Sequence, residues 1–116
     1  MKFEKDRPIY TQLVDDIESR IVNGEFKSGE KLPSIREYAE NKVVNPNTAQ
    51  KAYSELERSE YIFSKRGVGY FVNEDADKIS KLKCEYLNLQ IDAFINKMSN
   101  LSFSKEEIIE KIKEKL

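Results

Sequence analysis

Apolar residues recur at helical spacing along the first part of the chain. Large aliphatic side chains follow one another at intervals of four: Ile9, Leu13, Ile17 and Ile21. That interval keeps the side chains on one face of an α-helix. Pro8 suits the first turn of such a helix, and Gly24 can adopt the left-handed backbone that ends one. The pattern therefore predicts an amphipathic helix over residues 8–23.

Two further helix starts follow closely. Ser34 and Glu37 have the spacing of a capping box, so a second helix is expected from Ser34 to about Lys42. Asn45 is a good cap and Pro46 a good first helical residue, which predicts a third helix to about residue 58 or 59. The inner face of this third helix is expected to hold Ala49, Ala52, Tyr53 and Leu56.

The period then changes to that of a β-hairpin. Two runs of aromatic and β-branched residues, 61–65 and 70–72, flank the turn Arg66-Gly67-Val68-Gly69. Residues 73–77 are polar and form a plausible linker. The order of helix, helix, turn, capped helix and hairpin predicts an α+β fold, a winged helix-turn-helix with three helices and a β-hairpin wing. We assign it residues 1–75.

Residues 76–116 predict two helices. The first has one apolar line at spacings of three and four (Ile79, Leu82, Tyr86, Leu89, Ala93) and a second line (Leu87, Ile91, Phe94 or Ile95, Met98). The second begins at Ser104, which forms another capping box with Glu107. Two helices of this size are not expected to enclose a pocket for a metabolite. So wide an apolar arc favours a partner, so we assign residues 76–116 as a dimerisation region. The alternative is packing within one monomer.

Composition narrows the function classes. The 116 residues are 39% hydrophobic and 35% charged, with a net charge of −1, one cysteine and no histidine. His-based catalytic triads and the usual zinc sites are thereby excluded, and neither an enzyme, a metal nor a cofactor is expected. Cys84 lies in a helical stripe, where cysteines are mostly packing residues. With no apolar stretch of membrane-spanning length and no secretory signal, we expect a cytoplasmic protein without a membrane partner.

Charge is distributed unevenly, which favours a local nucleic-acid contact. Residues 31–73 hold seven Lys and Arg against five Asp and Glu. Amide, hydroxyl and basic side chains gather at the start of the third helix, where free backbone N–H groups attract anions. Lys65 and Arg66 stand at the turn of the hairpin. A winged-helix module that binds another protein, without DNA, is the alternative; such a module has no need for this concentration of cations and amides.

The motifs PIYTQL, GEKLPSIREYA, VNPNT, KAYSELE and GVGYFV, in this order over residues 8–72, resemble the DNA-binding domain of the GntR family of bacterial transcription regulators. The short helical tail is similar to the YtrA-like subfamily. This resemblance implies a repressor that binds a two-fold symmetric operator in double-stranded DNA as a homodimer and controls a transporter operon. Whether a small-molecule effector exists is left open by the sequence.

The resemblance also implies which residues contact DNA: Ser34, Arg36, Asn45, Asn47, Thr48, Gln50, Lys51, Tyr53, Lys65, Arg66, Gly67 and Gly69. Arg36 could instead pair with Glu40 on the helix surface. Those assigned to the dimer are Ile79, Leu82, Tyr86, Leu89, Phe94 and Met98. Three positions depart from the family pattern. Glu60 replaces a glycine at a left-handed position, Lys42 a leucine and Ala49 a valine.

Overall fold

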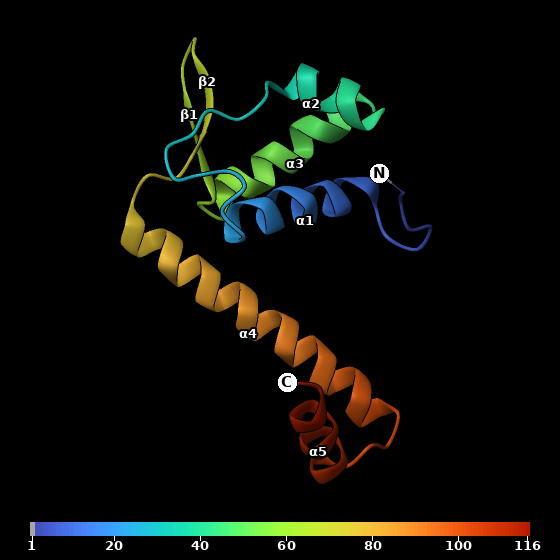
Figure 1. Ribbon diagram of the computed structural model, residues 1–116. Helices are drawn as coiled ribbons and strands as arrows, with labels where there is room; N and C mark the ends of the chain where they lie inside the picture. The colour runs from blue at the N-terminus through green and yellow to red at the C-terminus, as the bar shows by residue number, and fades with distance from the viewer. Residues whose placement is uncertain (1) are drawn as a thin grey trace. The chain divides into compact units, whose positions relative to one another are not determined.

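The computed structural model describes residues 2–116 and contains five helices and a two-stranded sheet in that range (Figure 1). Their bounds are α1 Ile9–Val22, α2 Ile35–Lys42, α3 Pro46–Arg58, β1 Ile62–Lys65, β2 Gly69–Val72, α4 Ala76–Asn100 and α5 Lys105–Lys115. This order confirms the predicted winged helix-turn-helix followed by two helices. The chain divides into two compact units, one ending at Leu82 and the other spanning Lys83–Leu116.

The core of the N-terminal unit lies where α1 and α2 both pack against α3. The predicted inner face of α3 is confirmed, because Ala49, Ala52, Tyr53 and Leu56 are all buried. Two alanines on one face allow neighbouring helices to approach α3 closely, which accommodates Ala49 at its position. Leu13 and Ile17 of α1 fill the space opposite without any exposure to solvent.

The hairpin pairs β1 with β2 in antiparallel register, from Ile62 opposite Val72 to Lys65 opposite Gly69. Ile62 and Val72 face the core, whereas Phe63 and Phe71 stack on the other face with centroids 5.6 Å apart. The Ser64 backbone N–H and hydroxyl both donate to the Glu57 carboxylate, at 3.0 and 2.7 Å. This carboxylate ties the wing to α3.

Three helices end in the same Schellman arrangement with a residue other than glycine in the left-handed position. Val43 after α2, Glu60 after α3 and Ser102 after α4 have φ of 57°, 68° and 66°. After α2, for example, the N–H groups of Val43 and Val44 donate to the carbonyls of Glu40 and Ala39. The left-handed backbone predicted for Glu60 is thus confirmed. Side chains at such positions cost about 1–2 kcal/mol each.

Glu18 of α1 predicts a pH-dependent stability. Burial, and secondarily the nearby Asp15 carboxylate, raise the pKa of Glu18 to about 7. Between the ordinary pKa of 4.5 and this value, the native state binds more protons than the unfolded state, so stability falls as the pH rises. Because Glu18 is only partly buried and solvent screens its charge, the full shift is discounted, and Glu18→Gln should stabilise the protein by about 1–2 kcal/mol at pH 8 and change little at pH 4.

Urea denaturation of Glu18→Gln at pH 4, 6 and 8 measures this effect. The exposed Glu74 provides a matched control, Glu74→Gln, which should leave the pH profile of the unfolding free energy unchanged. Equal stabilisation by Glu18→Gln at all three pH values would contradict the assignment.

The start of α4 belongs to the N-terminal unit. Asp75 caps this helix by accepting hydrogen bonds from the N–H groups of Asp77 and Lys78, at 3.0 and 3.2 Å. Leu82 is only 4% exposed and lies in the core of the unit, and Ile79 packs against that core. The assignment of Leu82 to a dimer contact therefore needs correction, because its apolar surface is already covered within the monomer. Ile79 is only partly covered, and its assignment stays a prediction.

The second unit holds the rest of α4 together with α5. A groove of about 620 Å³ lies between the two helices, with an apolar lining of Phe94, Met98, Phe103, Ile108 and Ile112. The expectation that the tail offers no cavity of this size was therefore wrong; the loop after Asn100 turns α5 back along α4 and leaves room between them. Apolar side chains of α4 remain exposed, including Leu87, Leu89 and Ile91.

Candidate nucleic-acid interface

The start of α2 presents one free cation. Ser34 caps the helix, since its hydroxyl oxygen accepts from the Glu37 N–H at 3.1 Å while the Glu37 carboxylate accepts from the Ser34 N–H at 3.0 Å. These hydrogen bonds lower the pKa of Glu37. Arg36 is exposed, and within residues 2–116 it has no carboxylate within 4.0 Å, so the alternative pair with Glu40 does not form. Its guanidinium is available to a ligand.

The start of α3 presents polar side chains around a capped helix end, where Asn45 accepts the hydrogen bonds of the first backbone N–H groups. Asn45 caps the helix, because its side-chain oxygen accepts from the Asn47 N–H at 2.8 Å. Its main-chain oxygen accepts from the N–H groups of Thr48 and Ala49. Asn47 and Gln50 project into solvent, whereas Thr48 is half-buried. Asn45 therefore has a structural role, and the side chains best placed for a ligand are those of Asn47 and Gln50.

Lys51 is exposed but already has a neighbour. Its ammonium lies 4.0 Å from the centre of the Tyr10 ring, on α1. This cation–π contact directs the charge toward the side of α3 that meets α1. The Tyr10 ring thus holds the Lys51 ammonium in position.

Tyr53 is not on the exposed surface of α3, and its assignment as a DNA contact is wrong. The side chain is fully buried and its hydroxyl donates to the Pro33 carbonyl at 2.7 Å. Its ring packs against Tyr38 and, edge to face, against Tyr70. Helical period explains the difference, since Tyr53 lies one turn after the buried Ala49. Burial raises the pKa of the Tyr53 hydroxyl above its ordinary value.

Two cations with different surroundings stand near the tip of the wing. The Lys65 ammonium lies 4.7 Å from the centre of the Phe71 ring and 5.7 Å from that of Phe63, so it is held along the strand pair. Arg66 and Gly67 are exposed at the turn. Gly67 has a φ of +75°, and a Cβ at this position would meet nothing within 4 Å, so the tip is open to close approach.

A further cation beside the wing, Lys31, was missed by the sequence reasoning. Its backbone forms an isolated antiparallel bridge with Phe71, and its side chain crosses Gly69. A Cβ at Gly69 would lie only 3.1 Å from the Lys31 Cε. This glycine therefore makes room for the lysine. No local pattern reveals the pairing, because the two backbones lie forty residues apart in the sequence.

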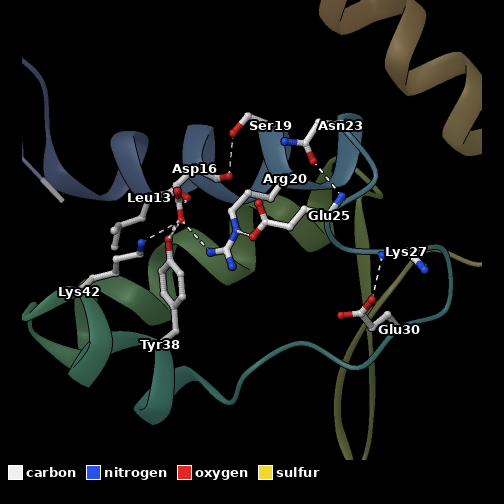
Figure 2. Close-up of polar contacts among 10 residues, drawn as sticks. All are labelled: Leu13, Asp16, Ser19, Arg20, Asn23, Glu25, Lys27, Glu30, Tyr38 and Lys42. Carbon is white, nitrogen blue, oxygen red and sulfur yellow. Dashed lines mark hydrogen bonds and ion pairs between the residues drawn. The ribbon is translucent and has the colours of Figure 1, made fainter.

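A polar cluster fixes α2 to α1 behind this surface (Figure 2). The Tyr38 hydroxyl donates to the Asp16 carboxylate at 2.7 Å, and the Lys42 ammonium lies 3.6 Å from the same oxygen. Arg20 approaches that oxygen at 3.4 Å and also donates to Glu25 at 2.7 Å. Burial, followed by the hydrogen bond to Asp16, raises the pKa of Tyr38. The cluster gives Lys42 a partner on α1, which accounts for a lysine at this position.

A family model covers the part of the chain in which these side chains lie. The model of the bacterial regulatory proteins of the gntR family matches residues 9–72, more than half of the chain. The chain belongs to the GntR family. Its helix-turn-helix and wing are the parts of the fold that this match covers, and the polar side chains described above lie on them.

Several relatives and solved structures extend the likeness to the tail. The GntR regulator is 41% identical to the HTH-type transcriptional regulator YhcF of Bacillus subtilis, covering 97% of this chain and 93% of the relative. It is 40% identical to the HTH-type transcriptional repressor YtrA of the same organism, covering 74% and 71%. A GntR-family regulator from Listeria monocytogenes has a TM-score of 0.88 at 41% identity, covering 97% and 98%.

A second solved structure contains DNA. The DNA-binding domain of AraR, solved in complex with the operator ORR3, has a TM-score of 0.57 at 29% identity and matches 62% of this GntR chain and 87% of its own. The relatives named above are transcription regulators, and the family that matches is not a family of enzymes. No helix in residues 2–116 has the length and apolarity required to cross a bilayer.

Proposed function

We propose that this GntR regulator is a cytoplasmic repressor that binds a two-fold symmetric operator in double-stranded DNA as a homodimer. Arg36 at the start of α2, Asn47 and Gln50 at the start of α3, and Arg66 on the wing would contact the DNA. The observation that carries the proposal is that these four side chains are exposed, and that the Arg36 guanidinium has no acidic partner in the part of the chain described.

The proposed roles follow from the chemistry of each group. Arginine binds phosphate oxygens or the O6 and N7 atoms of guanine, and asparagine and glutamine pair with adenine in the major groove. The positive end of the α3 helix dipole favours a phosphate nearby. Lys65 and Lys31 lie beside the wing and would add a field that attracts the DNA backbone. The complex of AraR with its operator supports this reading.

Exposed apolar residues of α4 in the second unit support the homodimer. Leu89 is 66% exposed and Leu87 58% exposed, which is unfavourable for a free helix in water. Association through Tyr86, Leu89, Phe94 and Met98 would cover part of this surface. It would also present two copies of α3, the proposed recognition helix, to successive half-sites. Repression would follow when the bound dimer blocks the polymerase, as the name of the YtrA relative suggests.

Arginine-to-alanine substitutions test the DNA contacts. Arg36→Ala and Arg66→Ala should each weaken binding to the DNA upstream of the regulator's own gene. If the lost contact is to a phosphate, the slope of log K against log salt concentration should become less steep by about one unit. Fluorescence anisotropy across a salt series measures both quantities.

Lys97→Ala in α4 is the matched control, because it removes the same charge from an exposed side chain of the tail. It should leave the affinity and the salt slope unchanged. Unchanged binding in both arginine variants would overturn the assignment. A wild-type protein that ignores the fragment at low salt would favour a protein-interaction module instead.

The proposed gene target is a neighbouring transporter operon. Deletion of the regulator's gene should raise transcription of that operon, and quantitative RNA measurement would detect the rise. An unchanged transcript level would contradict control of these genes while leaving the binding experiment unaffected.

A further inference from the structure

Val43 occupies a backbone position that suits its side chain poorly. Its φ and ψ of 57° and 55° lie in the left-handed region, where a β-branched residue is a rare exception. The side chain is 88% exposed, so no buried contact compensates for the conformation. Glycine would adopt this backbone more easily, and asparagine is the next most tolerant residue.

The surrounding fold imposes this conformation on Val43. The N–H of Val44 donates to the Ala39 carbonyl at 3.0 Å, which closes the Schellman motif, and Val44 itself packs against the core. On the other side, Lys42 is held by Asp16. The backbone is thus fixed on both sides, and the valine side chain contributes nothing visible to folding. Strained residues held in this way gather at functional sites.

Val43 lies beside the residues proposed to contact DNA. It lines a depression of about 510 Å³ between α2 and α3, together with Arg36 and Asn45. The rest of its wall consists of the apolar Ala39, Val44 and Pro46 and of the acidic Glu40. If Arg36 and the start of α3 approach a base edge, the two exposed methyl groups of Val43 would therefore lie close to that base.

We propose that Val43 is a specificity-determining residue that contacts the C5-methyl group of a thymine in the operator. This inference rests on the proposed DNA binding. The thymine methyl is the one apolar group that a base pair presents in the major groove, and small apolar side chains recognise it. A valine at this turn would favour thymine over cytosine. A glycine would make no contact that distinguishes the two bases.

Replacement of thymine by deoxyuridine tests the contact, because it removes only the methyl group. The probe is a duplex carrying the footprinted site upstream of the regulator's gene, or a site selected from random DNA, with one thymine changed at a time. The wild-type protein should lose about fourfold in affinity at one thymine of each half-site, the worth of one buried methyl group. Val43→Gly and Val43→Asn should bind thymine and deoxyuridine equally at that position.

The same two variants report on the strain. Both should melt at a higher temperature than the wild type, and both should keep any sensitivity to deoxyuridine at other positions of the site. Lower melting temperatures, an absence of any sensitive thymine, or a methyl effect that survives in Val43→Gly would overturn the inference while the proposed function stands. Failure of the wild type to bind any duplex would overturn the proposed function and this inference together.

Discussion

Alanine at Tyr53 is expected to destabilise the N-terminal unit by about 3–5 kcal/mol, the range measured for large aromatic side chains removed from a core. The ring is completely buried and touches Tyr38 and Tyr70, so its loss leaves a cavity among three packed elements. A loss of this size is a large fraction of the stability of a small domain. Urea denaturation followed by circular dichroism measures it directly.

A second substitution at Tyr53 separates a core role from a DNA role. Tyr53→Phe keeps the ring and removes only the hydroxyl that donates to the Pro33 carbonyl. It should cost about 1 kcal/mol of stability and leave operator affinity unchanged at temperatures where the protein is folded. Weaker DNA binding by Tyr53→Phe with unaltered stability would instead show that the Tyr53 hydroxyl contributes to the DNA interface.

The helix boundaries could be predicted because the signals for them are local. Ser34, Asn45 and Ser104 lie next to the donors that they satisfy, so spacing in the sequence is spacing in the structure. The β-hairpin follows from the same kind of information, since its two strands are joined by a short turn. The left-handed Glu60 could be predicted from the missing glycine. Val43 has the same left-handed backbone, which was not predicted from the sequence.

The errors arose where a residue has two possible roles or a partner far along the chain. Tyr53 lies both on the apolar face of α3 and among the residues that the family resemblance implied for DNA contact, and its burial decides between the two roles. Leu82 belongs to the same apolar line of α4 as the residues assigned to the dimer, but it is the last residue of the N-terminal unit, whereas the later residues of the line belong to the second unit. Lys31 meets Phe71 through a backbone pairing across forty residues. Periodicity placed Tyr53 on the buried face of α3, but it contains no information about the boundary at Leu82 or the pairing of Lys31.

The polar cluster on Asp16 links these observations to function. Apart from Glu25, which follows α1, its members come from α1 and α2, and it ties α2 to α1 while α2 packs against α3. Arg36 and Val43 occupy the two ends of α2, so their positions on the proposed DNA-facing surface depend on this cluster. A lysine in place of an apolar residue at position 42 therefore preserves the helix-turn-helix through an ion pair instead of apolar packing.

The double substitution Leu89→Glu with Phe94→Glu is expected to produce a monomer. Both side chains are exposed in the single chain, and they lie on different sides of α4, so the two carboxylates would place charge across any apolar interface formed by this helix. The monomer would bind each half-site separately and lose the advantage of linked binding, which is worth about a hundredfold in affinity. Sedimentation velocity measures the mass, and anisotropy on the upstream DNA measures the affinity.

Asn88→Glu with Gln90→Glu is the matched control, because it places the same two charges on the same helix at exposed polar positions. This control should remain a dimer and keep most of its affinity. The N-terminal unit has its own core, so both variants should unfold at nearly the temperature of the wild type. A Leu89→Glu, Phe94→Glu protein that still sediments as a dimer would show that α4 is not the interface, and a wild-type monomer would remove the dimer from the proposal.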